Sequence, residues 1–443
     1  MSLGILGGCS HSAISPEAVD PAAPEVWSRG GDEGSVHVDW VLSFDDPQLV
    51  SLVAEAVASN YELEQERARL YQAQQTVRIT RADRFPTLNV SLGSLRRGGE
   101  TTSELYDASI GMRWEVDLWG RLSKEQQAAQ LGLAAQRARL ESAERDLAAR
   151  TATSMFEVME SKQLLGVAEQ RLSNATESHD IVASGYRQGL NDALDLYLAR
   201  NQIERQQASY AQQEQIYLES IADLQLALAR YPDGAMAIEG QLPVLNDPIA
   251  AGLPSELLTR RSDLQEAWLN LLAADSDLAA AHKARFPSLL LVGSTGKTSI
   301  AFSNLLDGGT SSWSIAADLA QTLFDAGRLK ALQEQALARV QIAEQQYLSL
   351  VYRAFAEVEN AISRSTSLRQ RYESFLDAEK NSRAALDLAL EQYQRGLVSY
   401  TTVLQSQQLA FDAEETVVQL RSQLVQNRIA LYLALGGEFS SGS

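Results

Sequence analysis

The chain repeats itself at a spacing of 207 residues, so any fold must accommodate two similar halves. Three short motifs recur: YRQGL at 186–190 returns as YQRGL at 393–397, Gly-Arg at 120–121 returns at 327–328, and Arg-Phe-Pro at 84–86 returns at 285–287. The last pair is 201 residues apart, so the halves differ in length by about six residues between these landmarks. Solenoid repeats are roughly 20 to 50 residues long. The longer spacing therefore indicates duplication of a whole structural unit.

Long stretches of the chain lack helix-breaking residues. No proline lies between Pro86 and Pro232 or after Pro287, and residues 328–395 contain neither glycine nor proline. Apolar residues recur there at intervals of three and four from Leu329 to Val358, with charged and amide side chains between them. A continuous helix over this stretch would be about 100 Å long. The narrow, alanine-rich apolar stripe predicts long helices packed closely, as in a coiled coil.

Between each Phe-Pro and the following Gly-Arg, the periodicity changes from 3.6 to 2. Apolar residues alternate with polar ones over 108–118, 88–93 and 313–320, while 289–292 is apolar throughout. Turn residues separate the segments of each pair, at 96–99 and 307–309. Each half is therefore predicted to contain a β-hairpin whose strands are about ten residues long.

These strands are long enough to cross a bilayer with tilt, and one face of 108–118 carries Arg113, Glu115 and Asp117. This pattern favours a membrane barrel, although an amphipathic sheet on a soluble domain remains an alternative. No run of 18 or more apolar residues is present, so no transmembrane helix is predicted. Four strands cannot close a barrel. Two chains would give about eight strands and a filled lumen, whereas three chains give about twelve and a pore.

Composition argues against several other functions. The net charge of −19 and pI near 4.7 disfavour nucleic acid as a partner, because phosphate binding needs a basic surface. Cys9 is the only cysteine, which excludes an intrachain disulfide. We find no glycine-rich phosphate loop, paired-histidine motif or Gly-x-Ser-x-Gly elbow. The sequence thus predicts no enzyme activity, no cofactor and no metal site.

Two segments and a pair of turns carry a family resemblance. Together, in order and at matching offsets, residues 114–121 (WEVDLWGR), 323–328 (LFDAGR) and the two Tyr-x-x-Gly-Leu turns resemble the TolC-type outer-membrane efflux proteins, in particular the lipoprotein branch of tripartite drug-export systems. The resemblance implies a mostly α-helical chain with membrane β-structure. It implies a homotrimer whose twelve-stranded β-barrel lies in the outer membrane of a Gram-negative bacterium and continues as a long α-helical barrel through the periplasm.

The resemblance also implies a function. Members are passive, gated exit ducts for drugs or other small toxic compounds, opened at the periplasmic tip by an adaptor protein and an inner-membrane pump. An exit duct for type I protein secretion would share this architecture. From the helical segments alone, a soluble coiled-coil scaffold protein is a third alternative, which predicts a monomer or dimer that needs no detergent.

Residues 6–10, which include Cys9, resemble the lipobox of bacterial lipoproteins. Only eight residues precede Cys9, without the basic region and long apolar core of a signal peptide. Lipidation of Cys9, with outer-membrane lipid as a partner, and an incidental cysteine both remain open. We expect the proline-containing residues after Cys9 to wrap around the body of the protein.

The landmarks give expected boundaries for each part of the chain. They are a leader at 1–46, a helix at 47–86, a membrane hairpin at 87–120, long helices at 121–231, an inter-repeat link in an equatorial belt at 232–255, a helix at 256–286, a second hairpin at 287–326, long helices at 327–436 and a tail at 437–443.

Two sets of residues are candidates for functional positions in the family's architecture. Pro86, Gly120, Pro287 and Gly327 are expected at the junctions between helix and strand, where a bend or a close backbone approach is needed. The resemblance implies a periplasmic gate formed by Tyr186, Gly189, Asp192, Asp195, Tyr393, Arg395 and Gly396.

The two gate acids have a second interpretation. Asp192 and Asp195 follow a glycine turn, so both could instead cap the N-terminus of the next helix. The second tip also departs from the family pattern, with Val398, Thr402 and Gln405 where some members have an arginine and two aspartates. This departure weakens the transfer of the family's ion-pair latch to this chain.

Overall fold

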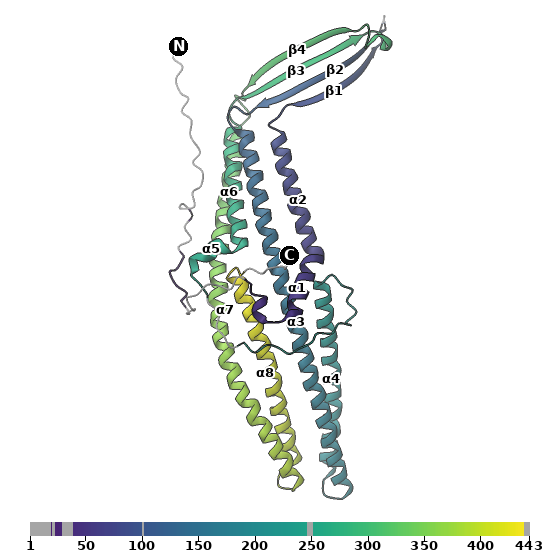
Figure 1. The fold of residues 1–443 in the computed structure, drawn as a ribbon, viewed down its shortest axis with the longest axis vertical. Helices are drawn as coiled ribbons and strands as arrows, with labels where there is room; N and C mark the ends of the chain where they lie inside the picture. Colours follow the sequence, from purple (N-terminus) through teal and green to yellow (C-terminus); the bar gives the residue numbers. More distant parts are fainter. Residues whose placement is uncertain (1–18, 20–22, 29–38, 100–101, 246–250, 438–443) are drawn as a thin grey trace. The chain divides into compact units, whose positions relative to one another are not determined.

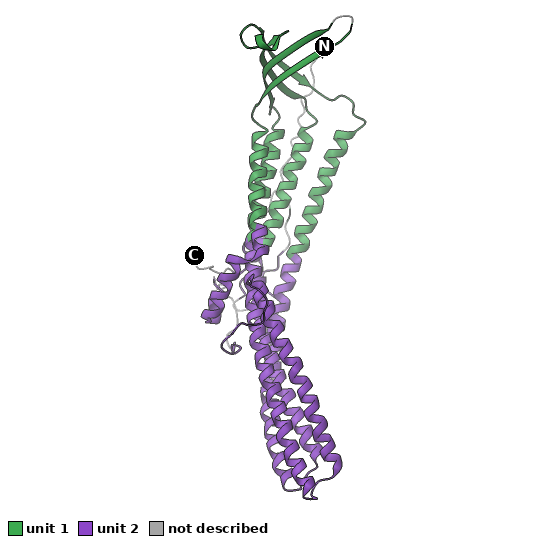
Figure 2. Ribbon diagram, turned by 90° about the vertical axis from the view of Figure 1, so that its right-hand side faces the viewer, with its two compact units in different colours: residues 1–22, 67–140, 263–351 green, residues 23–66, 141–262, 352–443 purple. Residues whose placement is uncertain are grey.

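The computed structural model describes residues 19, 23–28, 39–99, 102–245 and 251–437. They divide into two compact units (Figures 1 and 2). Unit 1 comprises residues 1–22, 67–140 and 263–351, and unit 2 comprises residues 23–66, 141–262 and 352–443. Cys9 and most of the expected leader lie outside the described residues.

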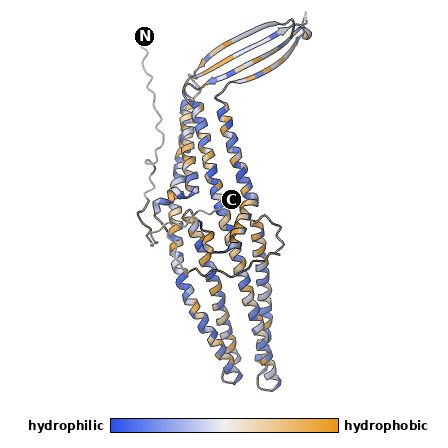
Figure 3. Ribbon diagram, viewed as in Figure 1, coloured by the Kyte–Doolittle hydropathy of each residue, from blue (hydrophilic) through white to orange (hydrophobic). Residues whose placement is uncertain are grey.

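Unit 1 contains one antiparallel sheet in the described part of the chain, built from two hairpins. Its strands are β1 (Thr87–Arg97), β2 (Ser103–Val116), β3 (Ser288–Ser299) and β4 (Thr310–Ala320), in the order β1-β2-β3-β4. β2 pairs directly with β3, with Trp114 opposite Leu291, so the two repeats join within the sheet. Hydrophobic and hydrophilic residues alternate along the strands (Figure 3). The two predicted hairpins are confirmed.

The long helices of the two repeats match residue for residue. α3 (Arg121–Arg187) and α7 (Arg328–Gln394) each have 67 residues, and α4 (Ala193–Ala227) and α8 (Tyr400–Ala434) each have 35. Their boundaries differ by the same 207 residues as the sequence motifs. The difference in length between the repeats is therefore confined to the segments before Gly120 and Gly327.

No helix among the described residues is both long and apolar enough to span a lipid bilayer.

The expected helix at 47–86 is divided in the structure. α1 (Pro47–Ser59) ends at Asn60, and α2 (Tyr61–Ala82) begins after it. Asn60 has extended backbone angles, and its side-chain oxygen accepts hydrogen bonds from the backbone N–H of Glu62 (2.9 Å) and Leu63 (3.2 Å). It thus ends one helix and caps the next. The expected helix at 256–286 is likewise divided, because the extended Arg261 separates α5 (Leu257–Arg260) from α6 (Ser262–Lys283).

The described part of the leader packs on the helices of unit 2. The Trp27 indole N–H donates to the carbonyl oxygen of Gly252 at 2.9 Å, and its ring contacts Phe355 of α7 edge-on. Trp40 is fully buried and stacks on Tyr432 of α8. These aromatic contacts attach the leader and the inter-repeat link to the helices.

Candidate gate at the helix tips

The two helical hairpins of unit 2 end in turns with the same backbone hydrogen bonds. At the first tip, Gly189 has φ +76° and the N–H of Leu190 donates to the carbonyl of Gly185 at 2.9 Å. At the second tip, Gly396 has φ +73° and the N–H of Leu397 donates to the carbonyl of Gln392 at 2.9 Å. This is the Schellman arrangement, in which a residue with positive φ ends a helix. Glycine is favoured there because it has no Cβ to clash.

The first tip has additional polar contacts that order its turn. Asp192 is the N-cap of α4, and its carboxylate accepts the N–H of Asp195 at 3.0 Å. Asn191 donates through its side-chain amide to the carbonyl of Val182 at 3.2 Å. The capping role expected as an alternative for Asp192 is therefore present, whereas Asp195 lies in the first turn of α4. At the second tip, Ser399 stands in the N-cap position without a side-chain cap bond.

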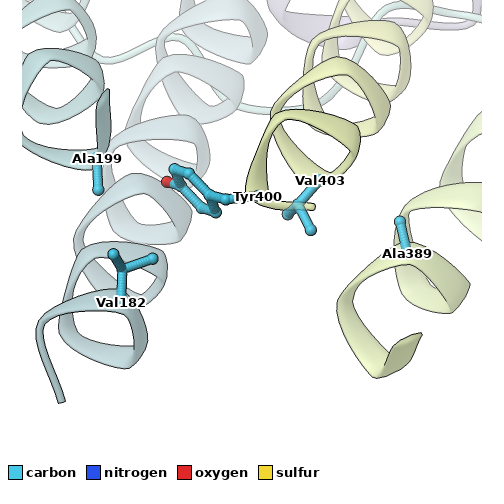
Figure 4. Close-up of a cluster of buried hydrophobic side chains, with 5 residues drawn as sticks. All are labelled: Val182, Ala199, Ala389, Tyr400 and Val403. Carbon is cyan, nitrogen blue, oxygen red and sulfur yellow. The ribbon is translucent and has the colours of Figure 1, made fainter. Parts of the chain in front are cut away.

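A buried apolar cluster joins the tips of the two hairpins (Figure 4). Its members come from all four long helices: Val182, Ala199, Ala389, Tyr400 and Val403. Figure 4 shows the Tyr400 ring extending from the start of α8 towards Val182 and Ala199. Tyr400 is only 1 % exposed. Its ring packs against the ring of Tyr393, with 5.6 Å between the two ring centres. The tips of the two repeats are thus held together by burial of apolar surface.

Acidic side chains lie close to Tyr400 and to Tyr393, which packs against the cluster. Burial, Tyr393 and Asp195 together raise the pKa of Tyr400 to about 12. Burial and the two aspartates also raise the pKa of Tyr393. Burial, and then the neighbouring Asp192, raises the pKa of the Asp195 carboxyl. Negative charges close together disfavour one another, so ionisation of Asp192 or Asp195 makes ionisation of the neighbouring tyrosines harder.

The two remaining gate candidates that carry side chains, Tyr186 and Arg395, are exposed. Arg395 forms an ion pair with Glu391, one turn earlier on α7. Tyr186 is 44 % exposed, and Leu190 and Leu397 are 77 % and 68 % exposed. The structure therefore brings Asp192, Asp195 and Tyr393 together with Tyr400, which the sequence analysis missed. A tyrosine seven residues after Tyr393 was the available signal.

The junction residues lie at the ends of the strands in unit 1. Pro86 and Pro287 directly precede β1 and β3, and Gly120 and Gly327 directly precede α3 and α7 with φ +75° and +87°. The indole N–H of Trp119 donates to the carbonyl of Pro287 at 2.6 Å, which links the junctions of the two repeats.

Acidic residues cap the helices that start at these junctions. The Asp117 carboxylate accepts the N–H groups of Leu122 (3.0 Å) and Ser123 (2.9 Å) at the start of α3. Asp325 accepts the N–H of Leu329 (3.0 Å) at the start of α7. Each cap satisfies donors that the helix itself leaves free and places a negative charge at the positive end of the dipole.

Comparison with known proteins identifies this architecture. The profile of the family described as "Outer membrane efflux protein" matches residues 52–230 and 253–437, which cover both repeats. The chain belongs to the outer membrane efflux protein family. It resembles the "Probable outer membrane lipoprotein SilC" of Salmonella typhimurium, with 29 % identity over 450 residues that cover 98 % of this chain and 96 % of SilC.

Two further relatives agree with this assignment. The "Solvent efflux pump outer membrane protein SrpC" of Pseudomonas putida is 29 % identical over 468 residues, covering 99 % of this chain and 97 % of SrpC. The solved structure of the outer-membrane channel OprN superposes with a TM-score of 0.86 at 25 % identity, covering 95 % of this chain and 97 % of OprN. The family fold predicted from the motifs is therefore confirmed, and the chain is an outer-membrane protein.

Proposed function

We propose that the chain is the outer-membrane exit duct of a tripartite efflux system for small toxic compounds. The observation that carries this proposal is the family match over both repeats, combined with two helical hairpins of equal length that end in matching turns on a common buried cluster. A soluble coiled-coil scaffold would not be expected to contain four strands with alternating polarity. The duct conducts passively, and the chain performs no chemistry of its own.

The duct requires several copies of the chain. β1 and β4 are the outer strands of the sheet, so each has one side without a partner strand in the described part of a single chain. Three copies would join these edges into twelve strands, which is enough for a pore. The long helices would continue the duct into the periplasm. Cys9, if acylated, would anchor each copy to lipid, in keeping with the name of SilC as an outer membrane lipoprotein.

Gating is proposed to occur at the helix tips. The buried cluster around Tyr400 keeps the two hairpins of each copy together, and the exposed Leu190 and Leu397 form part of the outer surface of the tips. A periplasmic adaptor and an inner-membrane pump open the duct by binding its open state more tightly than its closed state. Relatives named for the efflux of solvents, toluene and antibiotics favour small molecules over secreted proteins as cargo.

Complementation tests this function. The gene is expressed in a Gram-negative strain that has lost its own exit duct but retains an adaptor and a pump, and efflux of a fluorescent dye is measured. We expect restored efflux, and recovery of the protein as a trimer from detergent-solubilised outer membranes. A control truncated at residue 120 lacks the long helices and should restore nothing. Recovery of the full chain as a water-soluble monomer would refute the proposal.

A further inference from the structure

A cavity of about 1280 Å³ lies on unit 2 and is formed by one chain alone. Its lining residues come from the start of α2, from α3, from the end of α4, and from α7 and α8, and all of them belong to unit 2. Pockets that bind small molecules commonly measure roughly 300 to 1,000 Å³. The cavity is therefore large enough to hold a drug-sized compound together with water.

The long helices that line the cavity form one layer. α3 and α4 are one helical hairpin and α7 and α8 are the other, and Ser422 of α8 donates to Glu160 of α3 at 2.6 Å, so α8 adjoins α3. Figure 1 shows the resulting order α7, α8, α3, α4. The side-chain amide of Asn60, which precedes α2, donates to the carbonyl oxygen of Ala227 at the end of α4 at 3.1 Å. The cavity thus extends from α7 at one edge, over α8 and α3, to α4 and the start of α2 at the other.

The cavity and the leader lie on opposite faces of α7. Phe355 of α7 contacts Trp27 of the leader, whereas Arg364 and Arg371 line the cavity. These arginines follow Phe355 by nine and sixteen residues. At about 100° per residue, they are turned about 180° and about 160° away from Phe355 around the helix.

α8 has the same arrangement. Its Tyr432 stacks on Trp40, whereas Gln423, nine residues earlier and therefore about 180° around the helix, lines the cavity. When copies close into a ring, as the proposed function requires, the face that carries the leader must be outermost, because segments packed on the inner face would obstruct passage. The cavity then opens to the interior of the duct.

The α7 wall of the cavity carries two arginines. Arg364 and Arg371 are exposed, and neither has a hydrogen-bond or ion-pair partner within the described part of the chain. Seven residues separate them, so they lie about 10 Å apart along one side of the helix. The corresponding positions of the first repeat, 207 residues earlier, are Glu157 and Leu164. The basic wall is thus particular to α7 and is not a requirement of the repeated fold.

The opposite wall carries mainly carboxylates. Glu62 and Glu66 of α2, Asp146 of α3 and Asp223 of α4 line it, together with Arg150 of α3. The Arg150 guanidinium pairs with Glu62 at 3.0 Å. Asp223 is exposed and has no hydrogen-bond or ion-pair partner among the residues that the structure describes. The carboxylates of this wall outnumber its one arginine, so one end of the cavity is acidic and the other is basic.

The middle of the cavity is apolar with amide groups. Its apolar members on α3 and α8 include Leu147, Ile429, Ala430 and Leu433. Asn427 also lines the cavity and is 4 % exposed, and its amide donates to the carbonyl oxygen of Ala361 at 3.0 Å. The side-chain oxygen of Asn427 is buried and finds no donor among the described residues. Such an acceptor is the kind of group that a bound ligand or an ordered water satisfies.

We propose that this cavity binds amphiphilic zwitterions, which are compounds with a carboxylate at one end, an ammonium at the other and an apolar body between them. The carboxylate pairs with Arg364 and Arg371, because a guanidinium group offers parallel donors that fit a carboxylate. The ammonium pairs with the acidic wall around Asp223, and the apolar body covers the middle of the cavity. The inference rests on the proposed function and deepens it, since it names a class of compound that the duct holds during passage.

Fluorescence anisotropy with the purified full chain in detergent tests this proposal. The probe is ciprofloxacin, a fluorescent zwitterion whose aromatic body separates a carboxylate from an ammonium group. Its methyl ester lacks the negative charge, and its N-acetyl derivative lacks the positive charge. The variant Arg364→Ala/Arg371→Ala removes the basic wall. Its matched control is Arg353→Ala/Arg369→Ala, which removes two arginines from the same helix that do not line this cavity.

We expect saturable binding of ciprofloxacin to the unmodified chain. Arg364→Ala/Arg371→Ala should raise the dissociation constant about tenfold, because two exposed charge-assisted contacts are lost. The control variant should stay within about twofold of the unmodified chain, since its charge change is the same but lies elsewhere. The methyl ester should bind weakly and should not distinguish Arg364→Ala/Arg371→Ala from the unmodified chain.

The acidic wall has its own test. Asp223→Asn should weaken binding of ciprofloxacin about threefold and leave binding of the N-acetyl derivative unchanged, because that derivative has no ammonium to lose a partner. Arg364→Lys/Arg371→Lys keeps both positive charges and should recover part of the affinity, which a misfolded variant would not do. The proposal is overturned if ciprofloxacin shows no saturable binding, if the control variant loses as much affinity as Arg364→Ala/Arg371→Ala, or if the methyl ester binds as tightly as the zwitterion.

Failure of the site and failure of the proposed function give different results. The cavity belongs to one chain, so binding is measured without an adaptor or a pump. Binding as expected without complementation of efflux would refute the proposed function and leave the site standing. Restored efflux without saturable binding would refute the site alone.

Discussion

Tyr400 packs its ring in an apolar cluster and has the ionisable groups of Tyr393 and Asp195 nearby. Its ring is buried in the cluster that joins the two hairpins, and its hydroxyl has no hydrogen-bond partner among the described residues. A neutral phenol tolerates this position, whereas a phenolate would be desolvated close to Asp195. The side chain is therefore kept neutral by the same burial that makes it useful for packing.

We expect one tyrosine of the folded protein to titrate near pH 12. The pKa of Tyr400 is raised to about 12 from 10.0, so its stabilising contribution is complete below pH 10 and is lost as the pH rises towards 12. The loss is on the order of 2 kcal/mol. Absorbance titration at the phenolate band checks this, because the late component should disappear in Tyr400→Phe. Loss of a component near pH 10 instead would contradict the assignment.

Asp192 offers two separable contributions, a hydrogen bond and a charge. Asp192→Ala removes the N-cap of α4 and should destabilise the tip by about 1 kcal/mol. Asp192→Asn keeps a capping oxygen without the charge and should cost less. Hydrogen exchange of the amides at the start of α4 measures both variants. Equal protection in Asp192→Ala and the unmodified chain would show that the cap is not needed.

The two repeats match over the long helices and over the turns at their tips. Both tips depend on a glycine with positive φ, since an L-residue there places its Cβ too close to the backbone. Neither Gly189 nor Gly396 has a neighbouring heavy atom that would obstruct a methyl group. The penalty for a side chain at these turns is therefore conformational rather than steric crowding by a neighbour.

Gly189→Ala and Gly396→Ala should each destabilise their tip by roughly 1 to 2 kcal/mol. Gly132→Ala is a matched control, because Gly132 lies inside α3 with open space around it, and alanine is a better helix former. Limited proteolysis should therefore cleave the tips of the first two variants faster and leave Gly132→Ala unchanged. Faster cleavage in the control as well would argue against the turn as the cause.

The sequence predicted the helices and strands better than it predicted which side chains contact one another. Long helices followed from the absence of proline and glycine, and the hairpins followed from alternation. The break at Asn60 was missed because a single serine-asparagine step is a weak signal within a strongly helical segment. The hydrogen bond that the Ser422 hydroxyl donates to Glu160 was also missed, since the two residues are 262 positions apart and a serine carries no signature of burial.

At the scale of the whole molecule, the gate is expected to depend on several side chains acting together. Replacing Asp192, Asp195 and Arg395 with alanine should raise the single-channel conductance of the reconstituted protein in planar bilayers, because the acids at the first tip and the cation at the second are removed together. Glu391→Ala is the control, since it frees Arg395 from its ion pair without removing a gate residue. Unchanged conductance of the triple variant would assign the closed state to the apolar cluster.

The open sides of β1 and β4 have a consequence for biogenesis. In the described part of a single chain, the outer edges of these two strands leave rows of main-chain donors and acceptors without a partner strand, and such edges recruit other extended peptides. We therefore expect the chain to depend, before it assembles with other copies, on a partner that covers these edges. Chains that accumulate faster than they assemble would be expected to aggregate through these edges.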